Sequence, residues 1–264
     1  MCTRCGRPAC GDCLVQAAVG SHCLDCTKAS RPDVVTRTRL ATSGFHAPVT
    51  GALIAINVLV FVWMGAFGSR ITEKHVDLGL DRLFLSGVAL DDTVYQGEWY
   101  RLVSAGFIHF GVVHLLMNML LLYQLGNLLE RAVGSVRFAL LYFGSLLAGS
   151  FGVLLLDNPN TLTITGGASG AVYGLMAGAA VGLHRRGANV FNTGIGTTLL
   201  LNLVFTFTIP GISIGGHLGG AVGGAICGWV MLTPPWKPVP RWATWMTPVG
   251  VAAAALIGSV LVVG

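Results

Sequence analysis

A serine and a histidine lie in two separate apolar, glycine-rich stretches of this chain. Ser169 belongs to residues 166–174 and His217 to residues 211–220. An ionisable side chain in such a segment costs about 2.5–3.5 kcal/mol at mid-membrane when fully charged, so these positions are candidates for function. A histidine beside a serine can act as a general base and activate the hydroxyl as a nucleophile. The chemistry requires that the fold bring the two side chains together.

Polar residues occur at similar depths in three apolar stretches that would cross a membrane in the same direction. His114, Ser169 and His217 each lie fourteen or fifteen residues before the inner end of their stretch. At 1.5 Å per residue, this places all three about 7–9 Å below the outer face of a 30 Å hydrocarbon core. Asn118 and Tyr173 follow four residues after His114 and Ser169, so each shares the helix face of its partner.

Glycines recur at every fourth position of the two stretches, and small residues at this spacing let helix backbones touch. They are Gly166, Gly170, Gly174, Gly178 and Gly182 in one stretch, and Gly216, Gly220 and Gly224 in the other. We therefore expect the Ser169 hydroxyl and a ring nitrogen of His217 to reach hydrogen-bond distance.

The composition is that of an all-α polytopic membrane protein. Of 264 residues, 53% are hydrophobic and 10% are charged, and the mean hydropathy is +0.72. Apolar runs of about twenty residues predict membrane spans. The seven predicted spans are Pro48–Phe67, Val112–Leu129, Val136–Leu156, Gly167–Leu183, Thr193–Ile209, Ile214–Leu232 and Thr247–Val263.

The distribution of positive charge predicts the orientation. With the N-terminus in the cytoplasm, twelve of the 16 Lys and Arg lie on the inner side, and the other four lie in the long outer loop. We expect a multi-pass protein of the cell membrane with its C-terminus outside. Topology thus accounts for the net charge of +5 without a nucleic-acid partner.

Four parts are predicted along the chain. Residues 1–27 form a Cys-rich module, and residues 28–46 form a linker. Residues 47–232 hold six spans, with an outer loop at 68–111. Residues 233–264 add an inner loop and the seventh span.

The spans of Ser169 and His217 contain no carboxylate, so a Ser-His dyad is predicted rather than a Ser-His-Asp triad. The ring of His217 needs another means of orientation, and stacking on Tyr173 would provide it. Donors for a tetrahedral oxyanion are available in Asn118, His114 and the backbone N–H of Ser169 at a helix N-terminus.

Several motifs together resemble the rhomboid family of intramembrane serine proteases over residues 47–232. Gly167-Ala168-Ser169-Gly170 is similar to the GxSG motif of the nucleophile, and His217 is similar to the catalytic histidine. The other matches are Tyr173 as the stacking tyrosine, His109, His114 and Asn118 as HxxxxHxxxN, Trp99 and Arg101 as a Trp-Arg element of the outer loop, and Glu130 with Gly134 as ExxxG.

The resemblance implies a six-helix core plus a seventh helix. It also implies a serine endopeptidase that cuts transmembrane segments of membrane proteins near the outer leaflet. Catalysis would need no cofactor. His114 and Asn118 would help to bind the oxyanion. An intramembrane metalloprotease would need an HExxH helix, which this sequence lacks. A transporter, a channel or a catalytically silent rhomboid-like binding or chaperone module is the non-enzyme alternative.

Six of the seven cysteines form three CxxC pairs near the N-terminus, a pattern typical of a structural zinc site. The predicted ligands are Cys2, Cys5, Cys10, Cys13, Cys23 and Cys26. A tetrahedral site takes four ligands, so two cysteines are left over.

The string is similar to a B-box-type finger, in which ligand pairs bind two zinc ions in crossed order. That resemblance implies one zinc on Cys2, Cys5, Cys23 and Cys26, with the remaining pair in a second site whose other half is absent. Either the finger is shortened or residues before Met1 have been lost. A cytoplasmic protein partner of this module is a further expectation.

Overall fold

The computed structural model describes residues 1–3, 5–16, 21–29, 47–67, 71–72, 75–76, 98–156, 165–234 and 236–263. The chain divides into two compact units, Met1–His46 and Ala47–Gly264. Most of the predicted linker at 28–46 and of the predicted outer loop at 68–111 lies outside the described residues.

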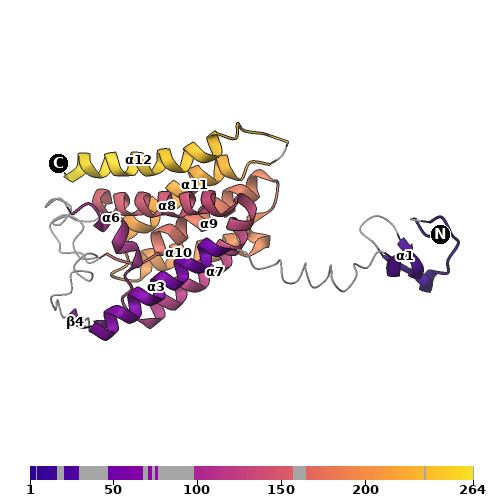
Figure 1. Cartoon of the computed structure of the whole chain (residues 1–264), viewed down its shortest axis with the longest axis horizontal. Helices are drawn as coiled ribbons and strands as arrows, with labels where there is room; N and C mark the ends of the chain where they lie inside the picture. Colours follow the sequence, from indigo (N-terminus) through magenta and orange to yellow (C-terminus); the bar gives the residue numbers. More distant parts are fainter. Residues whose placement is uncertain are drawn as a thin grey trace. The chain divides into compact units, whose positions relative to one another are not determined.

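The larger unit is built from helices (Figure 1). The long ones are α3 (Pro48–Phe67), α7 (Val112–Val133), α8 (Ser135–Leu156), α9 (Ser169–Arg185), α10 (Ile195–Thr208), α11 (Ile214–Met231) and α12 (Ala243–Val263). The short elements are α6 (Arg101–Ser104), the 3-10 helices η3 (Ala105–Phe107) and η4 (Val190–Thr193), and an antiparallel pair of β3 (Ile71–Thr72) and β4 (His75–Val76).

Within the described residues, five helices are long and apolar enough to cross a membrane: α3, α7, α8, α11 and α12. The protein is thus an all-α polytopic membrane protein, as the composition predicts. The predicted fourth and fifth spans correspond to α9 and α10, which have 17 and 14 residues. Helix α9 has the predicted length but starts and ends two residues later, because Gly167 with its positive φ of +124° precedes the helix. Helix α10 is shorter than predicted, because Gly194 with a φ of +77° delays its start and Pro210 follows its end.

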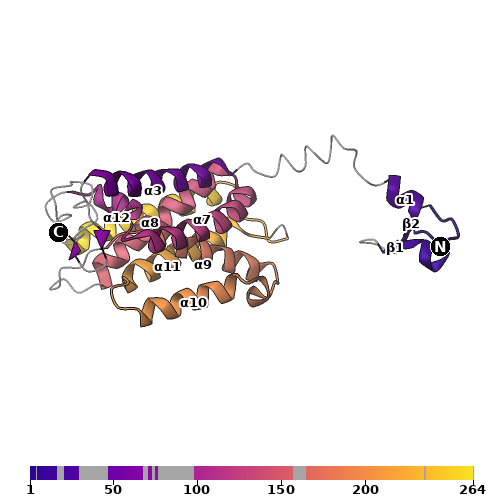
Figure 2. The same ribbon diagram turned by 90° about the horizontal axis from the view of Figure 1, so that it is seen from below.

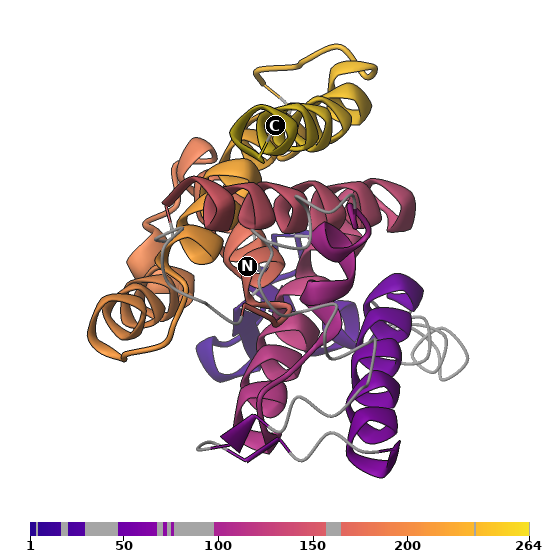
Figure 3. The ribbon, with the colours of Figure 1, turned by 90° about the vertical axis from the view of Figure 1, so that its left-hand side faces the viewer.

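Helices α8, α9 and α11 form the centre of this bundle. In α8, 67% of the most apolar 18 residues are buried, against 22% in α3 and 17% in α12. Figure 2 shows α3 and α10 at opposite edges of the bundle, and in Figure 3 the yellow α12 lies at another edge. The central helices therefore fix the geometry of the bundle, and the outer ones surround it.

The predicted close approach of the two glycine stripes is confirmed. A Cβ at Gly224 would lie 2.0 Å from the carbonyl oxygen of Gly174, and one at Gly228 would lie 2.5 Å from Gly178. Any larger side chain would push α9 and α11 apart, since real Cβ atoms do not approach backbone so closely. The glycines therefore bring the two helices into backbone contact.

Glu130, near the end of α7, holds the start of α3. Its carboxylate accepts hydrogen bonds from the backbone N–H of Val49 at 3.0 Å and of Thr50 at 2.8 Å. It also accepts from the Thr50 hydroxyl at 2.8 Å and from the Ser135 hydroxyl at 2.6 Å. The first amides of a helix have no partner within it, so Glu130 caps α3 from a neighbouring helix.

The smaller unit contains the 3-10 helix η1 (Gly11–Cys13), the strands β1 (Leu14–Gln16) and β2 (Ser21–Cys23), and the helix α1 (Leu24–Ala29). The strands pair in antiparallel register, with Leu14 opposite Cys23.

Candidate active site

Ser169 and His217 each lie in the first turn of a central helix. Ser169 is the first residue of α9, and His217 is the fourth residue of α11. The start of α11 is capped by Ser213, whose side chain accepts a hydrogen bond from the N–H of Gly216 at 3.0 Å. A Ser cap of this kind stabilises a helix end by about 0.5–2 kcal/mol. The two helix starts thus bring both side chains to one end of the glycine contact.

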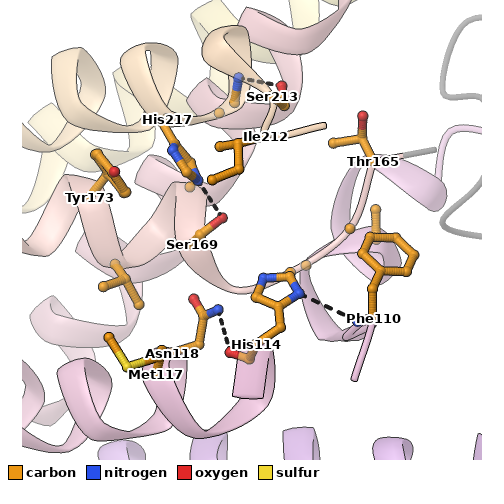
Figure 4. A pocket seen from close by; sticks show the side chains of 18 of the residues that line it. Phe110, His114, Met117, Asn118, Thr165, Ser169, Tyr173, Ile212, Ser213 and His217 are labelled. Carbon is orange, nitrogen blue, oxygen red and sulfur yellow. Dashed lines mark hydrogen bonds between the residues drawn. The ribbon is translucent and has the colours of Figure 1, made fainter. Parts of the chain in front are cut away.

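The side chains of Ser169 and His217 meet there, as expected from the sequence. The Ser169 Oγ lies 2.9 Å from His217 Nε2 (Figure 4). His217 is buried, with 9% of its surface exposed. The ring of Tyr173 stacks on the imidazole, with centroids 4.0 Å apart and planes at 15°. Stacking therefore fixes the plane of the histidine ring while its Nε2 faces the serine.

A cavity of about 690 Å³ adjoins the two residues. Ser169, His217, His114 and Asn118 contribute to its wall. The rest of the lining is largely apolar and includes Met117, Leu146, Val153, Phe205 and Ile209. An apolar cavity with a few convergent polar groups is typical of a binding or catalytic site.

His114 and Asn118 lie on the α7 side of this cavity (Figure 4). The Asn118 amide donates to the His114 carbonyl at 2.9 Å, and the Phe110 N–H donates to His114 Nδ1 at 3.3 Å. Accepting at Nδ1 leaves Nε2 of His114 as the ring's N–H donor. A Cβ at Gly167 would lie 2.8 Å from that Nε2, so only glycine fits between His114 and the serine loop.

The loop before Ser169 is held by two further contacts. Gly167 donates its N–H to the Ala105 carbonyl at 2.9 Å, and Ala168 donates to His109 Nε2 at 3.5 Å. Burial lowers the pKa of His109 to about 3, and the neighbouring His114 adds to this effect. His109 is therefore uncharged at neutral pH, and its Nε2 can accept the Ala168 N–H.

The two predicted outer-loop residues lie in different environments. Trp99 is exposed, whereas Arg101 at the start of α6 is buried. The Arg101 Nε donates to the Glu98 carboxylate at 2.7 Å, and a second guanidinium nitrogen forms an ion pair with the same group. This pair anchors α6, whose Leu102 carbonyl accepts from the Ser150 hydroxyl of α8 at 2.7 Å.

The sequence did not single out Thr206 or Ser213, although both contact the site. Thr206 Oγ1 lies 2.7 Å from Nδ1 of His217 and 2.6 Å from the Tyr173 hydroxyl. Ser213 could have been found as a helix-cap residue before an apolar run. Thr206 carries no such signal, because another threonine, Thr208, lies two positions away in the same helix.

Four cysteine sulfurs of the smaller unit lie within 4.8 Å of one another, and this group could hold a metal ion. They belong to Cys2, Cys5, Cys23 and Cys26. Hydrogen bonding with Cys5 is the main factor that raises the pKa of the Cys26 thiol to about 12.

The structure does not place Cys10 and Cys13 with these sulfurs, contrary to the prediction that they are metal ligands. Their sulfurs are joined in a disulfide. A CxxC pair needs two more ligands for a tetrahedral site, and the other described cysteines of this unit already form their own group.

Comparison with known proteins identifies the family of this chain. Residues 96–234, just over half of the chain, match the Rhomboid domain. The chain belongs to the rhomboid family. It is 31% identical to Rhomboid protease GluP of Bacillus subtilis over 174 residues, which cover 64% of this chain and 32% of that protein.

Two further relatives come from eukaryotes. RHOMBOID-like protein 4 of Arabidopsis thaliana is 34% identical over 66% of this chain and 45% of its own length. Rhomboid-like protease 1 of Toxoplasma gondii is 27% identical over 82% of this chain and 73% of its own length. The matched region thus spans less than half of the first two relatives.

Proposed function

We propose that this rhomboid is an intramembrane serine endopeptidase that works through a dyad of Ser169 and His217. The observation that carries the proposal is the 2.9 Å contact between Ser169 Oγ and His217 Nε2 at the wall of an apolar cavity. A serine hydroxyl is a weak nucleophile until an adjacent base removes its proton. The histidine is placed to do so.

In this mechanism the Ser169 oxygen attacks the scissile carbonyl carbon while His217 Nε2 takes the hydroxyl proton. The tetrahedral intermediate collapses when the histidine passes that proton to the leaving amine. Water then attacks the acyl-enzyme with the same histidine as base, which releases the acid product and restores Ser169. Every proton is accounted for by the dyad and one water molecule.

The oxyanion needs donors positioned where its charge develops. The backbone N–H of Ser169, at the start of α9, has no partner one turn earlier in the helix. The side chains of Asn118 and His114 line the same cavity and supply N–H groups. Together these groups can stabilise the tetrahedral intermediate without a metal ion.

The substrates we propose are transmembrane segments that unwind easily near the outer leaflet, with small side chains at the cut. The N-terminus lies in the cytoplasm and the C-terminus outside in this scheme, because twelve of 16 Lys and Arg then face inward. The dyad, close to the starts of the outside-to-inside helices α9 and α11, would lie near the outer face.

For the smaller unit we propose a structural zinc ion on Cys2, Cys5, Cys23 and Cys26. Four thiolates are a common ligand set for structural zinc, and the four sulfurs here lie within 4.8 Å of one another. Such an ion contributes folding energy to a short module with little core of its own. A protein partner of this unit stays a prediction from the sequence.

The alternative function is a catalytically silent module that binds transmembrane segments. Labelling by a fluorophosphonate and cleavage of a reporter transmembrane substrate in detergent distinguish the two. We expect both in the wild type and neither in Ser169→Ala or His217→Ala, with the double variant no worse than either single one. Ser259→Ala is the matched control, because Ser259 is a buried serine of α12 whose hydroxyl donates to the Ala255 carbonyl. Wild-type rates in Ser169→Ala would rule out the dyad.

A further inference from the structure

The proposed dyad uses only one nitrogen of the His217 ring, and the other also has a defined partner. Nδ1 lies 2.7 Å from the Thr206 hydroxyl oxygen. Thr206 is 2% exposed, and it is one of only two buried residues in α10, the other being Gly196. Helix α10, whose other side chains are half-buried or exposed, thus places the buried Thr206 hydroxyl against the proposed base His217.

The protons available to each partner decide which one donates this hydrogen bond. A threonine hydroxyl has one proton to donate and two lone pairs to accept with. Thr206 donates to the Asn202 carbonyl one turn earlier, at 2.8 Å. The Tyr173 hydroxyl lies 2.6 Å from Thr206 Oγ1 and donates to the same Asn202 carbonyl, so the two hydroxyls have two protons for their contacts with each other and with that carbonyl. A proton on His217 Nδ1, donated to Thr206 Oγ1, makes this contact a hydrogen bond without drawing a hydroxyl proton from the others, and it leaves the Nε2 lone pair free for the Ser169 hydroxyl.

We propose that Thr206 is a positioning residue that holds His217 in the tautomer with its proton on Nδ1. This inference rests on the proposed function, since it concerns the base of the dyad. In a Ser-His-Asp triad, a carboxylate accepts the Nδ1 proton and fixes the tautomer. Here an uncharged hydroxyl from a third helix takes that place, while Tyr173 fixes the plane of the ring.

The lining of the cavity should not change when Thr206 is replaced. Asn202 and Phe205 of α10 contribute to the wall, whereas Thr206 does not. Removing the Thr206 hydroxyl should therefore change the chemical step and leave substrate binding as it was.

Steady-state kinetics on a reporter transmembrane substrate in detergent test the role of Thr206. Thr206→Val keeps the shape of the side chain and loses the hydroxyl, and we expect kcat to fall about ten- to a hundredfold with KM unchanged. That is the range for a hydrogen bond to a group that becomes charged. Thr206→Ser should restore kcat to within about threefold of wild type, because the remaining loss is that of one methyl group.

Thr208→Val is the matched control. Thr208 lies in the same helix, makes the same bond to the carbonyl one turn earlier at 2.7 Å, and is exposed. Its kcat should equal that of the wild type. A Thr206→Val enzyme as fast as the wild type, or a Thr206→Ser enzyme as slow as Thr206→Val, would overturn the inference.

A second measurement needs no variant of Thr206. The ¹⁵N spectrum of histidine-labelled wild type, read against His217→Ala, reports which ring nitrogen carries the proton. Protonation at Nδ1 supports the assignment, and protonation at Nε2 overturns it. If the wild type showed no Ser169-dependent cleavage, the proposed function would fail. An active wild type with an unchanged Thr206→Val variant would reject the role of Thr206 alone.

Discussion

Gly220 of α11 lies directly against the backbone of Gly170 in α9. A Cβ at Gly220 would stand 2.0 Å from the Gly170 carbonyl oxygen and 3.0 Å from its Cα. Gly170 follows Ser169 in the chain, and Gly220 lies three residues after His217. One of the closest contacts between the two helices is therefore adjacent to the dyad, and it sets the distance between Ser169 and His217.

Gly220→Ala should therefore lower both stability and activity. Alanine is a better helix former than glycine by about 1 kcal/mol, but a methyl group forced against backbone costs about 1–3 kcal/mol or more. We expect a lower unfolding temperature in detergent and a lower kcat, because α11 must move away from Ser169. Gly65→Ala in α3 is the control, since a Cβ there meets nothing within 4 Å. A Gly220→Ala enzyme with wild-type stability would contradict the packing argument.

Asn118→Ala should slow catalysis without unfolding the protein. Loss of one donor to an oxyanion typically lowers kcat by a factor of about a hundred to a thousand. For Asn118→Ala we expect kcat to fall about ten- to a thousandfold. Asn127→Ala is a close control on the same helix, because the half-buried Asn127 makes the same bond to a carbonyl one turn earlier, at 2.7 Å. Its kcat should not change. Equal rates for the two variants would remove Asn118 from the oxyanion site.

Glu130→Gln should destabilise the bundle while leaving the residues around Ser169 in place. The carboxylate accepts four hydrogen bonds, and an amide would turn an N–H donor toward some of those donors. Leaving a buried donor unsatisfied costs about 1–3 kcal/mol. Ser135→Ala removes one of the four bonds and should cost less. Denaturation in detergent checks the order wild type, Ser135→Ala, Glu130→Gln, and a reversed order would refute the cap.

Much of this architecture follows from local sequence patterns. Glycines at every fourth position predict backbone contact between α9 and α11, because only a missing side chain permits it. The prediction of equal depths for Ser169 and His217 depends on helix rise alone, so it needs no knowledge of the packing. Helix spacing places Tyr173 on the same face as Ser169, and the lack of a carboxylate in the two spans makes Tyr173 a candidate to orient the His217 ring, which it does by stacking.

Other features depend on tertiary contacts that spacing does not encode. Thr206 and Thr208 look alike in the sequence, yet one is buried against His217 and the other is exposed. The difference arises because α10 packs on α9 and α11 along one narrow face. The disulfide of Cys10 and Cys13 likewise could not be read from three equivalent CxxC pairs, since pairing depends on which sulfurs the strands β1 and β2 bring together.

The smaller unit gives a prediction about metal that is separate from catalysis. Purified, reduced protein should contain about one zinc per chain, the count for one four-thiolate site. Replacing Cys23 and Cys26 together by Ser should abolish the zinc, because two ligands do not complete a tetrahedral site. Replacing Cys10 and Cys13 by Ser should leave it bound, since their sulfurs lie outside the cluster. Elemental analysis measures the zinc content per chain of the wild type and of the two double variants.

Cleavage in detergent should persist in both double variants, because the cysteines belong to a different compact unit from the cavity. Zinc-free wild type would refute the metal site, and loss of zinc from the Cys10 and Cys13 variant would make that pair part of it. Loss of cleavage along with the zinc would instead show that the unit is needed for catalysis. The two readouts thus separate the metal from the chemistry at Ser169.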